Sequence, residues 1–237
     1  MDITLYDAIT RRKSVRKYTN QPLSPDTLAR IDQAIASFAP LYPDLPLRHR
    51  VVRQVKGKFS VEAPQYLIIS GSGAAGDLEN AGFVFEQLVL WLDAHELGSV
   101  WLGSSKDTDG EQEGDLLALA FGEAAEPVHR EPSQFSRKPI EEITNSPDDL
   151  RIRSAHLAPS GLNIQPWRFE ETPENILVYR QNLRAPFSML YKLSDLDMGI
   201  ALCHFALTCE KEGRPFSFTR TEDLPDKKGC TPFGILA

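Results

Sequence analysis

The chain has 237 residues, 41% of them hydrophobic and 25% charged, which is typical of a globular protein forming one large domain or two small ones. Its formal net charge of −7 argues against a general nucleic-acid or anionic-membrane binder. Three cysteines without regular spacing exclude a disulfide framework, and neither a membrane span nor a signal peptide is recognisable, so we expect a cytoplasmic protein.

The first half of the chain contains alternating helix and strand signals. Apolar residues at helical spacing predict a helix over 3–12, and Ser24-Pro25-Asp26 predicts the start of a second helix, because these residue types favour helix N-termini. Further along, the sequence predicts a buried strand over 65–70, an apolar helix over 80–97 that Gly98 ends, a strand over 99–103 and a mobile acidic loop over 107–115.

The second half repeats this order. Ser146-Pro147-Asp148 repeats the helix-start signal, and strands are predicted over 175–179 and 216–219. Between these strands lies an apolar helix whose residues Gly199, Leu202, Phe205 and Cys209 follow Gly82, Phe85, Leu88 and Leu92 at an offset of 117.

We interpret the repeat as an internal duplication, because self-similarity at one period indicates copies of one structural unit. The predicted fold is α+β, with two related halves over 1–130 and 131–237 that together form one compact unit. Two copies of one unit usually pack about a pseudo-twofold axis, so we expect an intramolecular pseudo-dimer.

The first candidate site is the basic segment RRKSVRKY at 11–18. In an extended segment, Arg12, Ser14 and Arg16 would project to the same side. Guanidinium groups donate planar, bidentate hydrogen bonds that suit phosphates and carbonyl-rich rings. The alternative is an ordinary solvated basic stretch.

Two further segments of the second half carry polar groups. Ser160, Asn163 and Gln165 lie in a loop before Pro166-Trp167, where hydroxyl and amide groups could bind the edge of a heterocycle without charge. Arg137-Lys138 precedes a proline and is a second candidate for phosphate binding. The alternatives are a turn beside a buried tryptophan and a basic linker between the halves.

Together, RRKSVRKY, the stretch 77–103, SRKPIEE at 136–142 and LAPSGLNIQPWRF at 157–169 resemble the motifs of the nitroreductase-like, FMN-dependent oxidoreductases. The resemblance implies an FMN-dependent NAD(P)H oxidoreductase that reduces an electron-poor acceptor, such as a nitroaromatic or a quinone, by ping-pong hydride transfer. It implies twelve cofactor-binding residues, with Arg12 tuning the flavin and no side chain acting as a catalytic acid or base. These residues are Arg12, Ser14, Arg16, Trp101, Leu102, Gly103, Arg137, Lys138, Pro159, Ser160, Asn163 and Gln165.

The chain departs from the ordinary family pattern in one respect. Ordinary members carry both the arginine segment and the Asn-Gln-Pro-Trp segment in each protomer, whereas here the first occurs only in the first half and the second only in the second half. The chain therefore resembles the subgroup described as "putative TM nitroreductases", in which two similar subdomains share one chain. The resemblance implies one FMN between the halves, because the pseudo-symmetric position would place Glu141 and Glu142 where the phosphate needs cations. A monomer could then form a complete site.

Two other functions stay open. The same residues would serve a flavin-binding sensor without turnover. Gly71 to Gly76 fits the G-x-G-x-x-G pattern of a dinucleotide-binding fold, although the predicted helix starts too late for it. The histidines and cysteines show no ligand spacing for a metal site.

Overall fold

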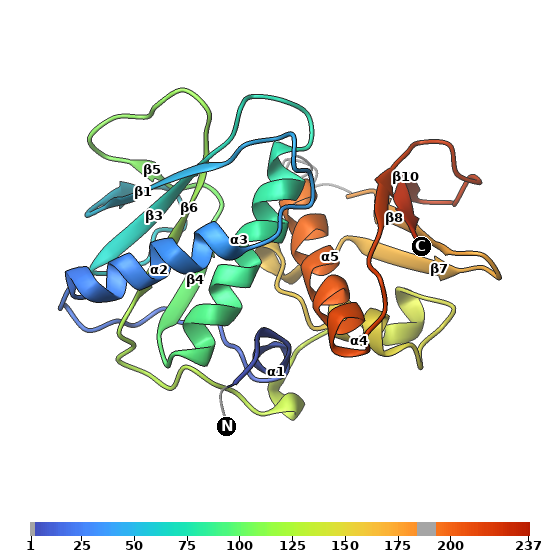
Figure 1. Cartoon of the computed structure of the whole chain (residues 1–237), viewed down its shortest axis with the longest axis horizontal. Helices are drawn as coiled ribbons and strands as arrows, with labels where there is room; N and C mark the ends of the chain where they lie inside the picture. Colours follow the sequence, from blue (N-terminus) through green and yellow to red (C-terminus); the bar gives the residue numbers. More distant parts are fainter. Residues whose placement is uncertain (1–2, 184–192) are drawn as a thin grey trace. The chain divides into compact units, whose positions relative to one another are not determined.

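The computed structural model describes residues 3–183 and 193–237. The chain divides into two compact units, Met1–Gln134 and Phe135–Ala237 (Figure 1). They are called unit 1 and unit 2.

Unit 1 is built on a four-stranded sheet in the order β1-β3-β6-β4, in which every neighbouring pair is antiparallel. The short strands β2 and β5 form a separate antiparallel pair, and α3 contacts α1, α2 and β4. The elements are α1 (Leu5–Ile9), α2 (Pro25–Ser37), β1 (Arg48–Val52), β2 (Val55–Lys56), β3 (Gln65–Ser70), α3 (Asp77–Ala94), β4 (Gly98–Leu102), β5 (Lys106–Asp107), β6 (Asp115–Gly122) and the 3-10 turn η1 (Pro132–Gln134).

Unit 2 has a four-stranded sheet in the order β7-β8-β10-β9, again antiparallel throughout. Its long helix α5 contacts α4 and β7. The elements are the turn η2 (Ile140–Glu142), α4 (Leu150–His156), the turn η3 (Gly161–Asn163), β7 (Trp167–Glu171), β8 (Ile176–Gln181), α5 (Ser194–Lys211), β9 (Phe218–Arg220) and β10 (Cys230–Leu236).

The two units share one topology, which confirms the prediction of two related halves. In each sheet the strand order is first, second, fourth, third, and the long helix connects the second strand to the third. Helices α3 and α5 each have 18 residues, and α5 both begins and ends 117 residues after α3. The offset predicted from four apolar pairs therefore holds for the whole helix.

Each core is formed by the sheet and the long helix. Every residue of β3 is buried, and α3 contributes Phe85 and Leu88 to the core of unit 1. In unit 2, Trp167 and Phe169 of β7 are fully buried, and Phe169 stacks on Phe205 of α5 at a centroid distance of 6.3 Å. Apolar burial on this scale is the main favourable contribution to folding.

Several predicted boundaries are wrong, for local reasons. Helix α2 begins after its Ser24 N-cap as predicted. In unit 2, however, the N-cap of α4 is Asp149, whose carboxylate accepts from the backbone N–H of Arg151 and Ile152, and Ser146-Pro147-Asp148 forms a turn before it. Helix α3 ends at Ala94 rather than at Gly98, because Glu96 adopts a left-handed φ of 60°.

The acidic segment 107–115 is more ordered than a mobile loop. Asp107 lies in β5, and Asp115 opens β6, a strand between β3 and β4 that the sequence pattern did not predict. Arg50 of β1 donates to both carboxylates, at 3.1 Å from Asp107 and 2.7 Å from Asp115. This hydrogen bonding holds the pKa of Asp115 well below its usual range.

The glycine-rich segment after β3 does not form a dinucleotide-binding turn. The buried carboxylate of Asp77 accepts from the backbone N–H of Gly73 at 2.7 Å and of Ala74 at 3.1 Å. A nucleotide phosphate would need such N–H groups and would be repelled by this carboxylate. The antiparallel sheet also lacks the parallel strands of that fold. In the described part of the chain, no helix has the length and apolar character needed to cross a membrane.

Candidate functional site

Three of the four described non-glycine residues with positive φ lie in the polar loop of unit 2. Leu162, Asn163 and Gln165 all have positive φ, between 50° and 58°. Such conformations are costly for residues other than glycine and persist only where the surrounding structure holds them. The loop that the sequence singled out is therefore kept in one unusual shape.

Hydrogen bonds from within the loop account for part of this shape. The Ser160 hydroxyl accepts from the backbone N–H of Gln165 at 2.9 Å. The buried Gln165 side chain donates to the Asn163 carbonyl at 3.0 Å and accepts from the backbone N–H of Lys138 at 2.8 Å. Gln165 therefore uses its side-chain amide to hold the loop. Pro159, at the start of the segment, is half-buried.

The basic segment of unit 2 is joined to this loop. Arg137 donates to Asn163 Oδ1 at 3.1 Å and to the carbonyls of His156 and Leu157 at the end of α4. Lys138 Nζ donates to the Gln165 carbonyl and to Gln181 Oε1. Burial lowers the pKa of Lys138. Two segments that the sequence identified separately thus form one cluster.

Asp197 of α5 also holds this loop, and the sequence reasoning missed it. Its Oδ1 accepts from the backbone N–H of Gly161 at 2.9 Å, and burial raises its pKa to about 7. Asn80 lies at the same position of α3, 117 residues earlier, and its Oδ1 accepts from the backbone N–H of Leu41 and Tyr42. A polar residue at one position of both apolar helices was the signal that could have revealed Asp197.

Asp197→Asn is expected to stabilise the protein at alkaline pH. The raised pKa means that the neutral carboxyl stabilises the fold below about pH 4, and that this stability is lost as the pH rises through about 7. Asparagine keeps an acceptor for Gly161 without the buried charge, so the variant should gain on the order of 1–3 kcal/mol at pH 8. Chemical denaturation at pH 4.5 and pH 8 measures this, and a gain of equal size at both would contradict the assignment.

In unit 1, the candidate tuning residue Arg12 is buried. Its Nε lies 3.6 Å from Glu86 Oε1, and only 3% of its side chain is exposed. Glu86 Oε2 accepts from Trp101 Nε1 at 3.0 Å, so this carboxylate joins Arg12 to Trp101. Burial lowers the pKa of Arg12, and Glu86 and Asp93 oppose that shift.

The rest of the basic segment runs along β4. Ser14 forms a parallel bridge with Ser99, and the Val15 N–H donates to the Ser99 carbonyl at 2.9 Å. Gly98 permits this approach, because a Cβ there would lie 2.7 Å from the Val15 side chain. Arg16 is exposed, and among the described residues its guanidinium donates only to the Ser14 carbonyl, at 3.2 Å. The alternating spacing predicted that Arg12 and Arg16 project to the same side, but the structure buries Arg12 and leaves Arg16 exposed.

The remaining predicted residues lie at the end of β4. The Leu102 side chain is buried in a core cluster with Tyr66 and Ile68, so only its backbone is available to a ligand. Gly103 follows it and is half-buried.

Arg130 is a second residue that the sequence reasoning missed. Its Nε donates to the Arg12 carbonyl at 3.0 Å. Burial, and repulsion from Arg12, lower the pKa of Arg130 to about 10. Glu86 and Asp93 provide opposite charges for Arg12, so the Arg12 guanidinium is compensated in part within unit 1. Arg130 lies in a stretch whose sequence resembles a linker, so no sequence pattern predicted a functional role for it.

Comparisons with known proteins agree with this organisation. The sequence profile of the family described as "Putative TM nitroreductase" matches residues 4–209. A protein from Thermotoga maritima msb8, described as a "putative nitroreductase", shares the fold with 20% sequence identity and a TM-score of 0.70, covering 100% of this chain and 94% of its own.

Two other solved structures resemble part of the chain. A nitroreductase family protein from Clostridium difficile 630 is 15% identical over 58% of this chain and 94% of its own, with a TM-score of 0.47. A Desulfovibrio desulfuricans protein, described as a "putative nitroreductase" in complex with FMN, is 20% identical over 58% and 93%, with a TM-score of 0.43. No curated protein matches the sequence.

Proposed function

Because the chain belongs to the family described as "Putative TM nitroreductase", as its motifs predicted, we propose that it is an FMN-dependent oxidoreductase. The proposal includes a reduced nicotinamide nucleotide as electron donor and an electron-poor acceptor, such as a nitroaromatic or a quinone. The FMN complex of the Desulfovibrio desulfuricans protein supports the choice of cofactor.

The observation that carries the proposal is the arrangement of cations in unit 1. Arg12 Nε is buried and has no hydrogen-bond acceptor among the described residues, while Arg130 lies close enough to be destabilised by its charge. Glu86 and Asp93 oppose part of the Arg12 charge, and an anionic cofactor near the two guanidinium groups would add to that compensation. The residues present therefore fit a flavin mononucleotide.

FMN, when bound, supplies the redox chemistry by accepting a hydride from the donor and passing electrons to the acceptor. The residues of the chain would bind and tune it. Arg12 stabilises negative charge on the flavin, and Arg16 neutralises phosphate charge. The pre-shaped loop over 160–165 contributes the Ser160 hydroxyl and backbone groups at little further cost in conformational entropy.

Titration with FMN tests the cofactor assignment. We expect saturation at one equivalent per chain, because the Arg12-Ser14-Arg16 segment occurs only in unit 1 and the Ser160–Gln165 segment only in unit 2. A value near two would contradict this reading. Anaerobic addition of NADH or NADPH should then bleach the flavin absorbance, and bound flavin that neither nucleotide bleaches would favour the sensor instead.

Arg16→Ala should weaken FMN more than riboflavin. Arg16 is exposed and its guanidinium holds no other element in place, so its loss removes one phosphate contact worth roughly 1.5–3 kcal/mol, or about 10- to 150-fold in FMN affinity. Lys17→Ala, which removes the neighbouring exposed cation, is the matched control. Equal losses of affinity for FMN and riboflavin would show that Arg16 does not contact the phosphate. Arg137 is less suitable for this test, because it also caps α4.

A further inference from the structure

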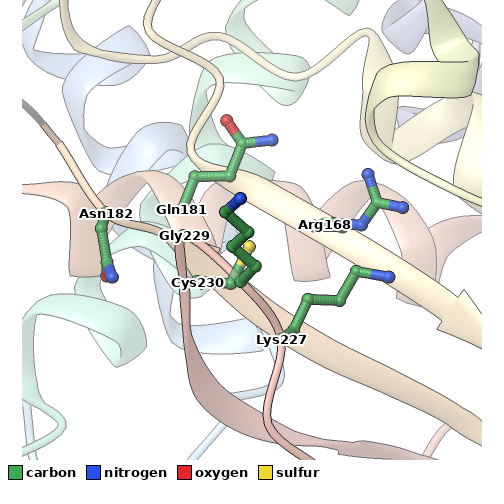
Figure 2. Close-up of a pocket in the computed structure, with 7 residues that line it drawn as sticks. Arg168, Gln181, Asn182, Lys227, Gly229 and Cys230 are labelled. Carbon is green, nitrogen blue, oxygen red and sulfur yellow. The ribbon is translucent and has the colours of Figure 1, made fainter.

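A cavity of about 650 Å³ lies within unit 2 (Figure 2), and none of its lining residues is among the twelve assigned to the flavin, although Gln181 accepts from Lys138 Nζ at 2.8 Å. It is lined by Arg168 of β7, by Gln181 and Asn182 at the end of β8, and by the turn 227–230 that leads into β10. Cavities of 300–1,000 Å³ are typical of small-molecule sites.

The lining is cationic. Arg168, Lys227 and Lys228 come from two separate segments, and none of the described lining residues is acidic. Glu170 accepts from Arg168 at 2.6 Å and from Lys227, both at Oε1. One carboxylate therefore holds two cations side by side and neutralises only part of their charge.

Two hydrogen-bond donors of the lining, on Lys228 and Arg168, are available to an anionic ligand. Lys228 is exposed, and no described residue forms an ion pair or a hydrogen bond with its ammonium group. Arg168 uses Nε for Glu170 and Nη1 for the Glu142 carbonyl, at 2.8 Å, which leaves Nη2 without an acceptor in the described part of the chain. Figure 2 shows Arg168 and Lys227 extending from neighbouring segments of the lining.

Hydrogen bonds within the protein hold the turn 227–230 of the cavity wall in place without a ligand. The Asn182 N–H donates to the Gly229 carbonyl at 2.9 Å, and Thr231 Oγ1 donates to Asn182 Oδ1 at 2.7 Å. The Cys230 N–H donates to the Lys227 carbonyl at 3.0 Å and closes the turn. The lysines are thus presented on a turn tied to β8, so binding would order few additional groups.

We propose that this cavity binds a phosphate-bearing small molecule. Three cations with one shared carboxylate favour a ligand of more than one negative charge, and a guanidinium fork beside ammonium groups suits phosphate oxygens. Its lining shares no residue with the set assigned to FMN, and the proposal stands whether or not the proposed redox function holds.

Calorimetric titration with pyrophosphate and with ADP tests the proposal, using the full chain saturated with FMN, or as purified if it binds none. We expect both probes to bind in low salt. If the natural ligand is a nucleotide, ADP should bind more tightly than pyrophosphate. If it is not, pyrophosphate should bind at least as tightly as ADP. Lys228→Gln should weaken either probe at least tenfold, because it removes an unpaired cation from an exposed turn without disturbing the core.

Lys56→Gln, which removes an exposed cation from β2 in unit 1, is the matched control and should leave binding unchanged. The proposal would be overturned by no binding of either probe, by equal loss in Lys228→Gln and Lys56→Gln, or by displacement of either probe by FMN at one further equivalent. Lys227→Gln provides a second variant, and unaltered affinity in both cavity variants would also exclude the site.

Discussion

Asn80→Asp should lower the free energy of unfolding by about 3–5 kcal/mol at pH 8. Asn80 is fully buried, and its side-chain amide donates to the carbonyls of Tyr42 and Leu45, at 3.2 and 2.8 Å. Aspartate would lose these donors and place a carboxylate against two carbonyl oxygens. The cost of leaving such buried groups unpaired adds to the cost of burying the charge.

The pH dependence of this effect follows from the same burial. A carboxylic acid at position 80 would have its pKa raised in the folded state, so the variant loses stability as the pH rises from about 4 towards that raised pKa. Denaturant titrations at pH 4.5 and pH 8 should therefore show the larger loss at pH 8. A loss below about 1 kcal/mol at pH 8 would contradict the role given to Asn80.

Glu86→Gln should destabilise the protein by about 3 kcal/mol, because breaking a buried ion pair leaves its partner uncompensated. Both side chains of the Arg12–Glu86 pair are almost completely buried. Glutamine keeps an acceptor for Trp101 Nε1, so the variant removes the charge while preserving that hydrogen bond. Asp93 also attracts Arg12, so Arg12 keeps one opposite charge when Glu86 is replaced, which limits the expected loss of stability.

A double-mutant cycle with Arg12→Met separates the ion pair from simple packing. Removing both charges should cost less than removing Glu86 alone, because the uncharged Met–Gln pair leaves no Arg12 charge without its partner. Additive losses in equilibrium unfolding would show that Arg12 and Glu86 do not interact. FMN affinity should fall in both variants that lack Arg12, which provides an independent readout of its assigned contact with the flavin.

Local signals predicted the start of α2 and the offset between the two long helices. Ser24 caps α2, and the apolar pattern of α3 and α5 reproduced their offset, because a buried helix requires its apolar residues at fixed spacing. Strand β6 was missed because its Asp115 appeared to belong to an acidic loop. Arg50 and Ser70, which lie far away in sequence, donate to that carboxylate and hold it at the start of β6.

Residue types at the candidate site could be predicted from the sequence, but their hydrogen bonds could not. Asn163 and Gln165 suggested groups directed at a ligand, whereas the structure uses their amides to stabilise a backbone with positive φ. That conformation depends on Arg137 and Asp197, which lie 26 and 34 residues away from Asn163. No local pattern encodes such contacts.

The difference between Asn80 and Asp197 has an evolutionary consequence. In a dimer of identical chains, every substitution appears in both copies, so a change that favours one copy and harms the other is selected against as a whole. Once the two copies occupy one gene, each position can drift alone. One helix could then keep a permanently neutral side chain while its counterpart acquired a proton-binding group, a division of labour that no homodimer can encode.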